Sequence, residues 1–61
     1  MKAKDVQRIR AKTGLSQSGF ANLLGVSVRT IQEWEQGRQS PGAPSVTLLK
    51  LADAGRLQPK R

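Results

Sequence analysis

The outer face of one predicted helix carries a mixture of polar and apolar side chains that can recognise another molecule. Ile31 and Trp34 lie three residues apart and predict a helix over residues 28–36, with both side chains turned inward. The residues left on its outer face are Val28, Arg29, Gln32 and Glu33. They supply hydrogen-bond donors, an acceptor and one small apolar group, which together can read base edges in a major groove. The segment therefore predicts contact with the bases of double-stranded DNA.

Each of these four side chains has an expected partner. Arg29 is the first candidate for specificity, because a guanidinium can bond guanine O6 and N7 together. Its alternatives are a phosphate contact or simple solvation. Val28 either contacts a thymine methyl group, which is the favoured interpretation, or is an exposed valine without a role. Gln32 is expected at a base edge or the DNA backbone. Glu33 either accepts a hydrogen bond from cytosine N4 or braces Arg29, and bracing is the favoured interpretation.

This helix is the second of a predicted pair that spans residues 17–36. Ser16 and Ser27 stand just before the two helices, where a hydroxyl can accept from a backbone N–H of the first turn. Gly25 and Gly37 stand just after them, where glycine adopts a positive φ without a Cβ penalty. The apolar side chains predicted to fill the wedge between the helices are Phe20, Ala21, Leu24, Val26, Ile31 and Trp34. The pair therefore predicts a helix-turn-helix.

This motif resembles the helix-turn-helix of the lambdoid phage repressor and Cro (XRE) superfamily. Gln17 opens the motif, and Ala21 and Gly25 occupy its two small-residue positions. The flanking stretches also match, with GLSQ at 14–17 and WEQGRQSP at 34–41. The sequence VSVRTIQEWEQGR, followed by a proline-rich turn and TLLKLA, is most similar to that of antitoxins of the HigA type. The resemblance covers nearly the whole chain and implies the fold and DNA binding of that superfamily.

Polar residues around the motif are expected at the DNA backbone. The start of the helix at 17–24 favours an anion, because its free N–H groups and dipole point there. In relatives the residue matching Gln17 touches a phosphate, and the resemblance implies the same contact here. Ser16 and Ser27 can cap helices and bind phosphate at once, or act only as caps. The full set expected at phosphates is Ser16, Gln17, Ser18, Ser27, Thr30 and Arg38.

Charged residues of the first predicted helix have two expected roles. In phage repressors of this superfamily, a basic residue in the first helix pairs with an acidic residue after the recognition helix. The matching residues here are Arg10 and Glu35, so the resemblance implies a partly buried, architectural ion pair between them. Arg8 and Lys12 either flank Arg38 at the DNA backbone or are solvated.

The remaining segments predict two further helices, over residues 3–12 and from Pro44 to about Ala54. The fold class is therefore all-α, a compact helix-turn-helix domain of four helices, or five, of the phage-repressor type. Apart from the wedge residues, the side chains predicted for its core are Ile9, Leu15, Leu48, Leu51 and Ala52. Val46 and Leu49 lie off the stripe of the last helix and are left open between the core and a subunit contact. The predicted domain covers residues 1–55, and residues 56–61 form a short basic tail.

Composition excludes several classes of function. The 61 residues carry a net charge of +7, from eleven Lys and Arg against four Asp and Glu, so a polyanion is the expected partner. The chain has no cysteine or histidine, so neither a metal site nor another cofactor is expected. Nothing in the sequence assembles a nucleophile with a base, so no enzyme is predicted. The absence of a long apolar run predicts no membrane partner and a cytoplasmic location, at the nucleoid when bound to DNA.

The sequence predicts sequence-specific binding of double-stranded DNA by an autoregulatory transcriptional repressor. Members of the superfamily bind palindromic operators as dimers, so the resemblance implies a homodimer on DNA. The alternative is an antitoxin whose main role is to bind a cognate toxin protein, with DNA binding secondary. An acidic surface or a flexible extension usually helps such antitoxins to bind a basic toxin, whereas this chain is itself basic. Three possibilities therefore stay open: the folded domain binds the toxin, a segment outside this sequence binds it, or there is no toxin.

Overall fold

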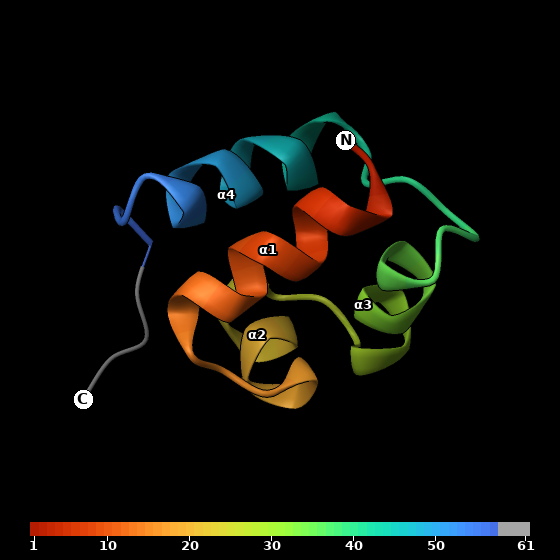
Figure 1. Ribbon diagram of the computed structural model, residues 1–61, viewed down its shortest axis with the longest axis horizontal. Coiled ribbons are helices and arrows are strands. Elements are labelled where there is room, and N and C mark those ends of the chain that lie inside the picture. Colours follow the sequence, from red (N-terminus) through yellow and green to blue (C-terminus); the bar gives the residue numbers. More distant parts are fainter. Residues whose placement is uncertain (58–61) are drawn as a thin grey trace.

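The computed structural model describes residues 1–57 and contains four α-helices in that range (Figure 1). They are α1 (Ala3–Thr13), α2 (Gln17–Leu24), α3 (Val28–Glu35) and α4 (Ala43–Asp53). The predicted all-α class is confirmed, and each helix lies within one or two residues of its predicted bounds. Residues 58–61 of the predicted basic tail lie outside the described residues.

The helix ends follow local capping chemistry. Gly14 ends α1 at φ 72° and Gly25 ends α2 at φ 74°, a conformation in which any other L-residue would be strained. The hydroxyl of Ser16 accepts from the N–H of Gly19 at 3.0 Å. The hydroxyl of Ser27 accepts from the N–H of Thr30 at 3.1 Å. Both serines therefore cap the helices that they precede.

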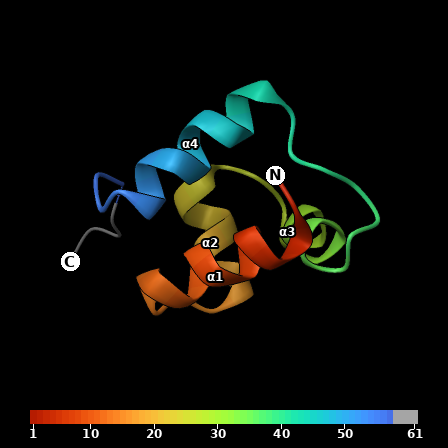
Figure 2. The same cartoon turned by 45° about the horizontal axis from the view of Figure 1, so that its top comes forward.

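Helix α1 occupies the centre of the fold and contacts each of the other three helices. Figure 1 shows α4 along one side of α1, with α2 and α3 on the other side. After the 45° turn of Figure 2, α4 is seen running past α1 and α2, while the long α3–α4 connection loops away at the side. Helices α3 and α4 do not touch each other within the described residues. The outer side of α3 is therefore left uncovered.

The core forms where α1 and α2 pack against the inner face of α3 and against α4. Its fully or nearly buried apolar side chains are Val6, Ile9, Phe20, Ala21, Leu24, Ile31, Trp34, Leu49 and Ala52. Leu15, Val26 and Leu48 are half-buried and pack against this cluster, as does Leu57. The contact of Leu57 shows that the packed part of the chain continues past residue 55.

The predicted core face of α4 is wrong at one position. Leu51 is 38% exposed, whereas Leu49 is fully buried. The apolar residues of α4 lie on several sides of the helix, so their spacing alone does not single out the inner face. Packing against α1 selects the side that carries Leu49 and Ala52. Leu49 therefore belongs to the core, and Val46 is half-buried.

Asp53 joins the end of α4 to α1. Its carboxylate accepts from Arg8 Nη1 and from Lys12 Nζ, each at 2.9 Å. These hydrogen bonds, from Arg8 first and then from Lys12, lower the pKa of Asp53 to about 2. Arg8 and Lys12 remain exposed, as the solvated alternative has it, but their pairing with Asp53 was not predicted from the sequence. The sequence signal is weak because 41 or more residues separate the partners.

Candidate nucleic-acid interface

The outer face of α3 is exposed along most of its length. The Arg29 side chain is 84% exposed, and Val28 is one of three exposed large apolar residues in the described part of the chain. Gln32 is exposed and Glu33 is half-buried. On the opposite side, Ile31 and Trp34 are buried in the core. Helix α3 thus presents all four predicted base-reading side chains away from the core.

Glu33 lies beside Arg29 on this face. The distance from Arg29 Nε to Glu33 Oε1 is 3.6 Å, an ion pair between successive turns of the helix. The carboxylate lies close enough to attract the guanidinium, although such an exposed pair adds little stability. The geometry is that of the bracing interpretation of Glu33.

Two open hollows flank Arg29. The larger, of about 280 Å³, is lined by Arg29, Gln32, Glu33, Gln36 and Arg38. The smaller, of about 190 Å³, is lined by Ser27, Arg29, Thr30, Glu33, Trp34 and Gln39. Gln36 and Gln39 were not among the predicted site residues, because they follow the periodic part of α3. Gln36 lines the larger hollow together with Arg38, whereas Gln39 lines the smaller one. Their nearness to Arg38 in the sequence was the available signal.

Most of the residues predicted to bind phosphate are exposed at helix starts or after α3. Ser16 and Ser18 are exposed at the start of α2, and Ser27 is exposed at the start of α3. The hydroxyls of Ser27 and Thr30 lie 2.9 Å apart and share a hydrogen bond. The Arg38 side chain is exposed and forms no ion pair within residues 1–57.

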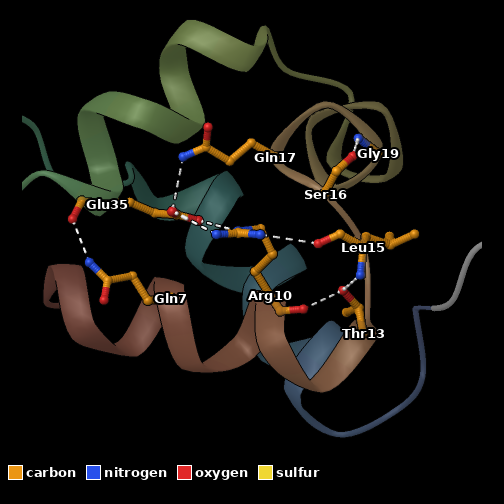
Figure 3. A network of polar contacts seen from close by, with 8 residues as sticks. All are labelled: Gln7, Arg10, Thr13, Leu15, Ser16, Gln17, Gly19 and Glu35. Carbon is orange, nitrogen blue, oxygen red and sulfur yellow. Dashed lines mark hydrogen bonds and ion pairs between the residues drawn. The ribbon is translucent and has the colours of Figure 1, made fainter.

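Gln17 differs from the other predicted phosphate ligands because its side chain already has a partner. Its Nε2 donates to Glu35 Oε1 at 3.1 Å. Figure 3 shows the amide nitrogen directed at the carboxylate and the amide oxygen directed away from it. One of the two N–H groups of this amide is therefore committed to the end of α3.

The predicted pair of Arg10 and Glu35 forms in the structure, at the centre of this network (Figure 3). Arg10 Nε donates to Glu35 Oε2 at 2.6 Å, and Arg10 Nη2 donates to Glu35 Oε1 at 3.2 Å. Arg10 Nη1 also donates to the carbonyl of Leu15 at 3.2 Å. Gln7 Nε2 donates to the backbone carbonyl of Glu35 at 2.7 Å. The network thus connects α1, the α1–α2 turn, α2 and α3.

The charges of this pair are stabilised by their surroundings. Burial alone raises the pKa of Glu35, but the hydrogen bonds from Arg10 and Gln17 outweigh it, so the pKa lies below its usual value. The hydrogen bond to Glu35 raises the pKa of Arg10. Both groups are therefore ionised at neutral pH, and Glu35 is the only charged side chain that is buried among residues 1–57.

Two bundled helices, with one outer face exposed and polar, define a helix-turn-helix domain of the DNA-binding type. Comparison with known proteins agrees, because the family described as Helix-turn-helix matches residues 6–56. The chain belongs to this family, in its repressor and Cro branch near the HigA type. The predicted superfamily is therefore confirmed.

Two curated relatives show where the similarity lies. Antitoxin HigA-2 of Vibrio cholerae serotype O1 is 47% identical over 47 residues, which are 77% of this chain and 45% of that protein. The uncharacterised HTH-type transcriptional regulator YiaG of Escherichia coli strain K12 is 38% identical over 50 residues, 82% of this chain and 52% of that protein. The chain thus spans about half the length of these relatives.

Other comparisons are negative. No solved structure matches the chain significantly. No helix within residues 1–57 combines the length and the hydropathy needed to cross a lipid bilayer. In the same range, the Asp and Glu side chains form no group of three that could hold a metal ion.

Proposed function

We propose that this domain binds double-stranded DNA sequence-specifically and acts as a transcriptional repressor of its own operon. The observation that carries the proposal is the outer face of α3. Its arginine, glutamine and valine are exposed while the opposite face is held in the core. A rigid helix with this composition fits the donor, acceptor and methyl pattern of a major groove. The helix-turn-helix family membership supports the same conclusion.

Within this proposal, each group of residues has a separate task. Arg29 bonds a guanine, Val28 contacts a thymine methyl group, and Gln32 reads a neighbouring base edge. Glu33 braces Arg29 across the 3.6 Å ion pair. The polar residues at the starts of α2 and α3, with Arg38 after α3, hold the phosphates and set the register of the helix.

We further propose that two copies bind a palindromic operator, with half-sites about one helical turn apart. A single domain of this size reads only a few base pairs, so a second copy adds the length that specific recognition needs. The place of action is then the cytoplasm, at the nucleoid.

The test is selection from a randomised duplex pool at about physiological salt, for the parent and for Arg29→Ala. We expect the parent to select a palindrome that contains a guanine. Arg29→Ala should relax preference at that guanine alone, with a discrimination loss of about 1–3 kcal/mol. Lys50→Ala is the matched control, since it also removes a cation but lies on α4, which does not contact α3. If no motif emerges and binding is uniformly weak, the proposal fails.

A second candidate function rests on the similarity to antitoxin HigA-2. In that case the domain, or the longer protein that contains it, binds a toxin and DNA binding is secondary. The decisive experiment is co-purification with the product of the neighbouring gene, followed by rescue of growth when that product is expressed. A complex that forms and restores growth supports the antitoxin function, and no complex rejects it.

A further inference from the structure

The hydrogen bond from Gln17 to Glu35 joins two helix ends that the chain itself leaves apart. Gln17 is the first residue of α2 and Glu35 is the last residue of α3. The turn at residues 25–27 connects the other ends of the same two helices. The helix pair is therefore closed by the backbone at one end and by the 3.1 Å side-chain contact at the other.

The acceptor of this bond is itself immobilised. Arg10 holds both carboxylate oxygens of Glu35, at 2.6 and 3.2 Å, and the Glu35 side chain is only 7% exposed. A carboxylate held in this way has little freedom to follow Gln17, so the glutamine must adjust to it. The start of α2 is thereby placed at a defined position relative to α3.

We infer that Gln17 is a positioning residue for base reading, which acts through Glu35, and that its main role is not the phosphate contact expected from its place in the motif. This inference rests on the proposed function. The hydrogen bond from Gln17 Nε2 to Glu35 fixes the position of the start of α2, where phosphate is expected to bind, relative to the outer face of α3. Exposed Ser16 and Ser18 remain beside it to contact phosphate.

The two roles predict different effects on DNA binding. Loss of a phosphate contact weakens binding about equally for all sequences. Loss of the hydrogen bond between Gln17 and Glu35 leaves every charge in place, so binding to an unrelated duplex should persist. Binding to the operator should weaken, because it requires α2 to contact phosphates while α3 contacts bases. The ratio of the two affinities therefore distinguishes the roles.

The experiment uses Gln17→Met, which keeps the length of the side chain and removes its donors. Dissociation constants are measured by fluorescence anisotropy for the selected operator and for a scrambled duplex at one salt concentration. We expect the operator constant to rise about 3- to 10-fold, the worth of one hydrogen bond, and the scrambled constant to change by about twofold or less. Gln17→Ala should lower the ratio of operator affinity to scrambled-duplex affinity in the same way.

Gln7→Met is the matched control, because Gln7 also donates to Glu35 but to its backbone carbonyl, from α1. It should keep the affinity ratio of the parent. Thermal melts followed through Trp34 set a temperature at which every variant is folded. An equal loss on both duplexes, or a ratio that also falls in Gln7→Met, overturns the inference. A parent that does not prefer its operator over the scrambled duplex overturns the proposed function, and the inference with it.

Discussion

Glu35 illustrates how a small helical domain tolerates a buried charge. Its carboxylate accepts from Arg10 and Gln17, and its backbone carbonyl accepts from Gln7. Removing a charge from water costs several kcal/mol unless partners replace the lost hydration. The two donors to the carboxylate come from α1 and α2, so the contacts that satisfy the charge of Glu35 also join the end of α3 to both helices.

At the residue scale, the face of α4 can be tested by two truncations of the same residue type. Leu49→Ala should lower the free energy of unfolding by about 2–5 kcal/mol, because it opens a cavity at a fully buried site. Leu51→Ala should cost about 1 kcal/mol or less, because Leu51 is 38% exposed. Urea denaturation followed by circular dichroism measures both. Equal losses would contradict the packing of α4 described above.

At the scale of elements, α2 and α3 are short helices of eight residues each. Isolated helices of this length are marginal in water, so caps and tertiary contacts must hold them. The serine caps are local and act in any context. The closure by Gln17 and Glu35 is a tertiary contact, and Arg10 of α1 holds the same carboxylate.

Two glycine substitutions test the local contributions to α2. A Cβ added at Gly19 would meet Leu15 and Ser16 at 3.4 Å, which is ordinary contact, so Gly19→Ala should stabilise the domain by about 0.5–1 kcal/mol. Gly25→Ala should instead destabilise it by about 1–2 kcal/mol, because φ is 74° there. Thermal unfolding gives both signs. A stabilising Gly25→Ala would show that the turn is not held in the left-handed conformation.

The contribution of the α1–α4 ion pairs to the stability of the fold should decrease at low pH. The pKa of Asp53 is lowered from 3.8 to about 2 in the folded state, so its contribution is present above pH 3.8 and is lost as pH falls towards 2. Asp53→Asn should therefore slightly lower the melting temperature at neutral pH and flatten its decline between these values. The double variant Arg8→Gln, Lys12→Gln is the control and should flatten the same window. An unchanged decline in either protein would refute the contribution of this ion pair.

For the whole molecule, the distribution of charge matters more than the total of +7. All four carboxylates are engaged within the domain. Asp5 accepts from the backbone of Lys2, Glu33 lies beside Arg29, Glu35 beside Arg10, and Asp53 beside Arg8 and Lys12. By contrast, Lys4, Arg38, Lys50 and Arg56 pair with no carboxylate in residues 1–57. The surface therefore offers cations to an anionic partner.

Salt dependence measures this electrostatic part of binding. If about six phosphates are contacted per complex, the logarithm of affinity should fall against the logarithm of salt concentration with a slope near −0.9 for each contact. Arg38→Ala should reduce the slope by about 1 per bound copy and weaken all sequences alike. Lys50→Ala is the control, since α4 does not touch α3. A slope that Arg38→Ala leaves unchanged would remove Arg38 from the backbone contacts.

The sequence by itself determined the features that depend on neighbouring residues. Ser16 and Ser27 as caps, the glycines that end helices, and the inward side of α3 all follow from interactions within a few positions. Helix propensity and capping act locally, so their effects do not wait for the rest of the fold. The pair of Arg10 and Glu35 came from the resemblance, because 25 residues separate the two.

Only the tertiary structure decided which side of α4 is buried and where Gln17 points. The apolar residues of α4 favour more than one face, and packing against α1, with Asp53 held by Arg8 and Lys12, selects the side of Leu49. A free glutamine at the start of a helix can turn to solvent or to an anion. The buried carboxylate of Glu35 is the stronger acceptor within reach, because low local polarity strengthens a hydrogen bond to a charge.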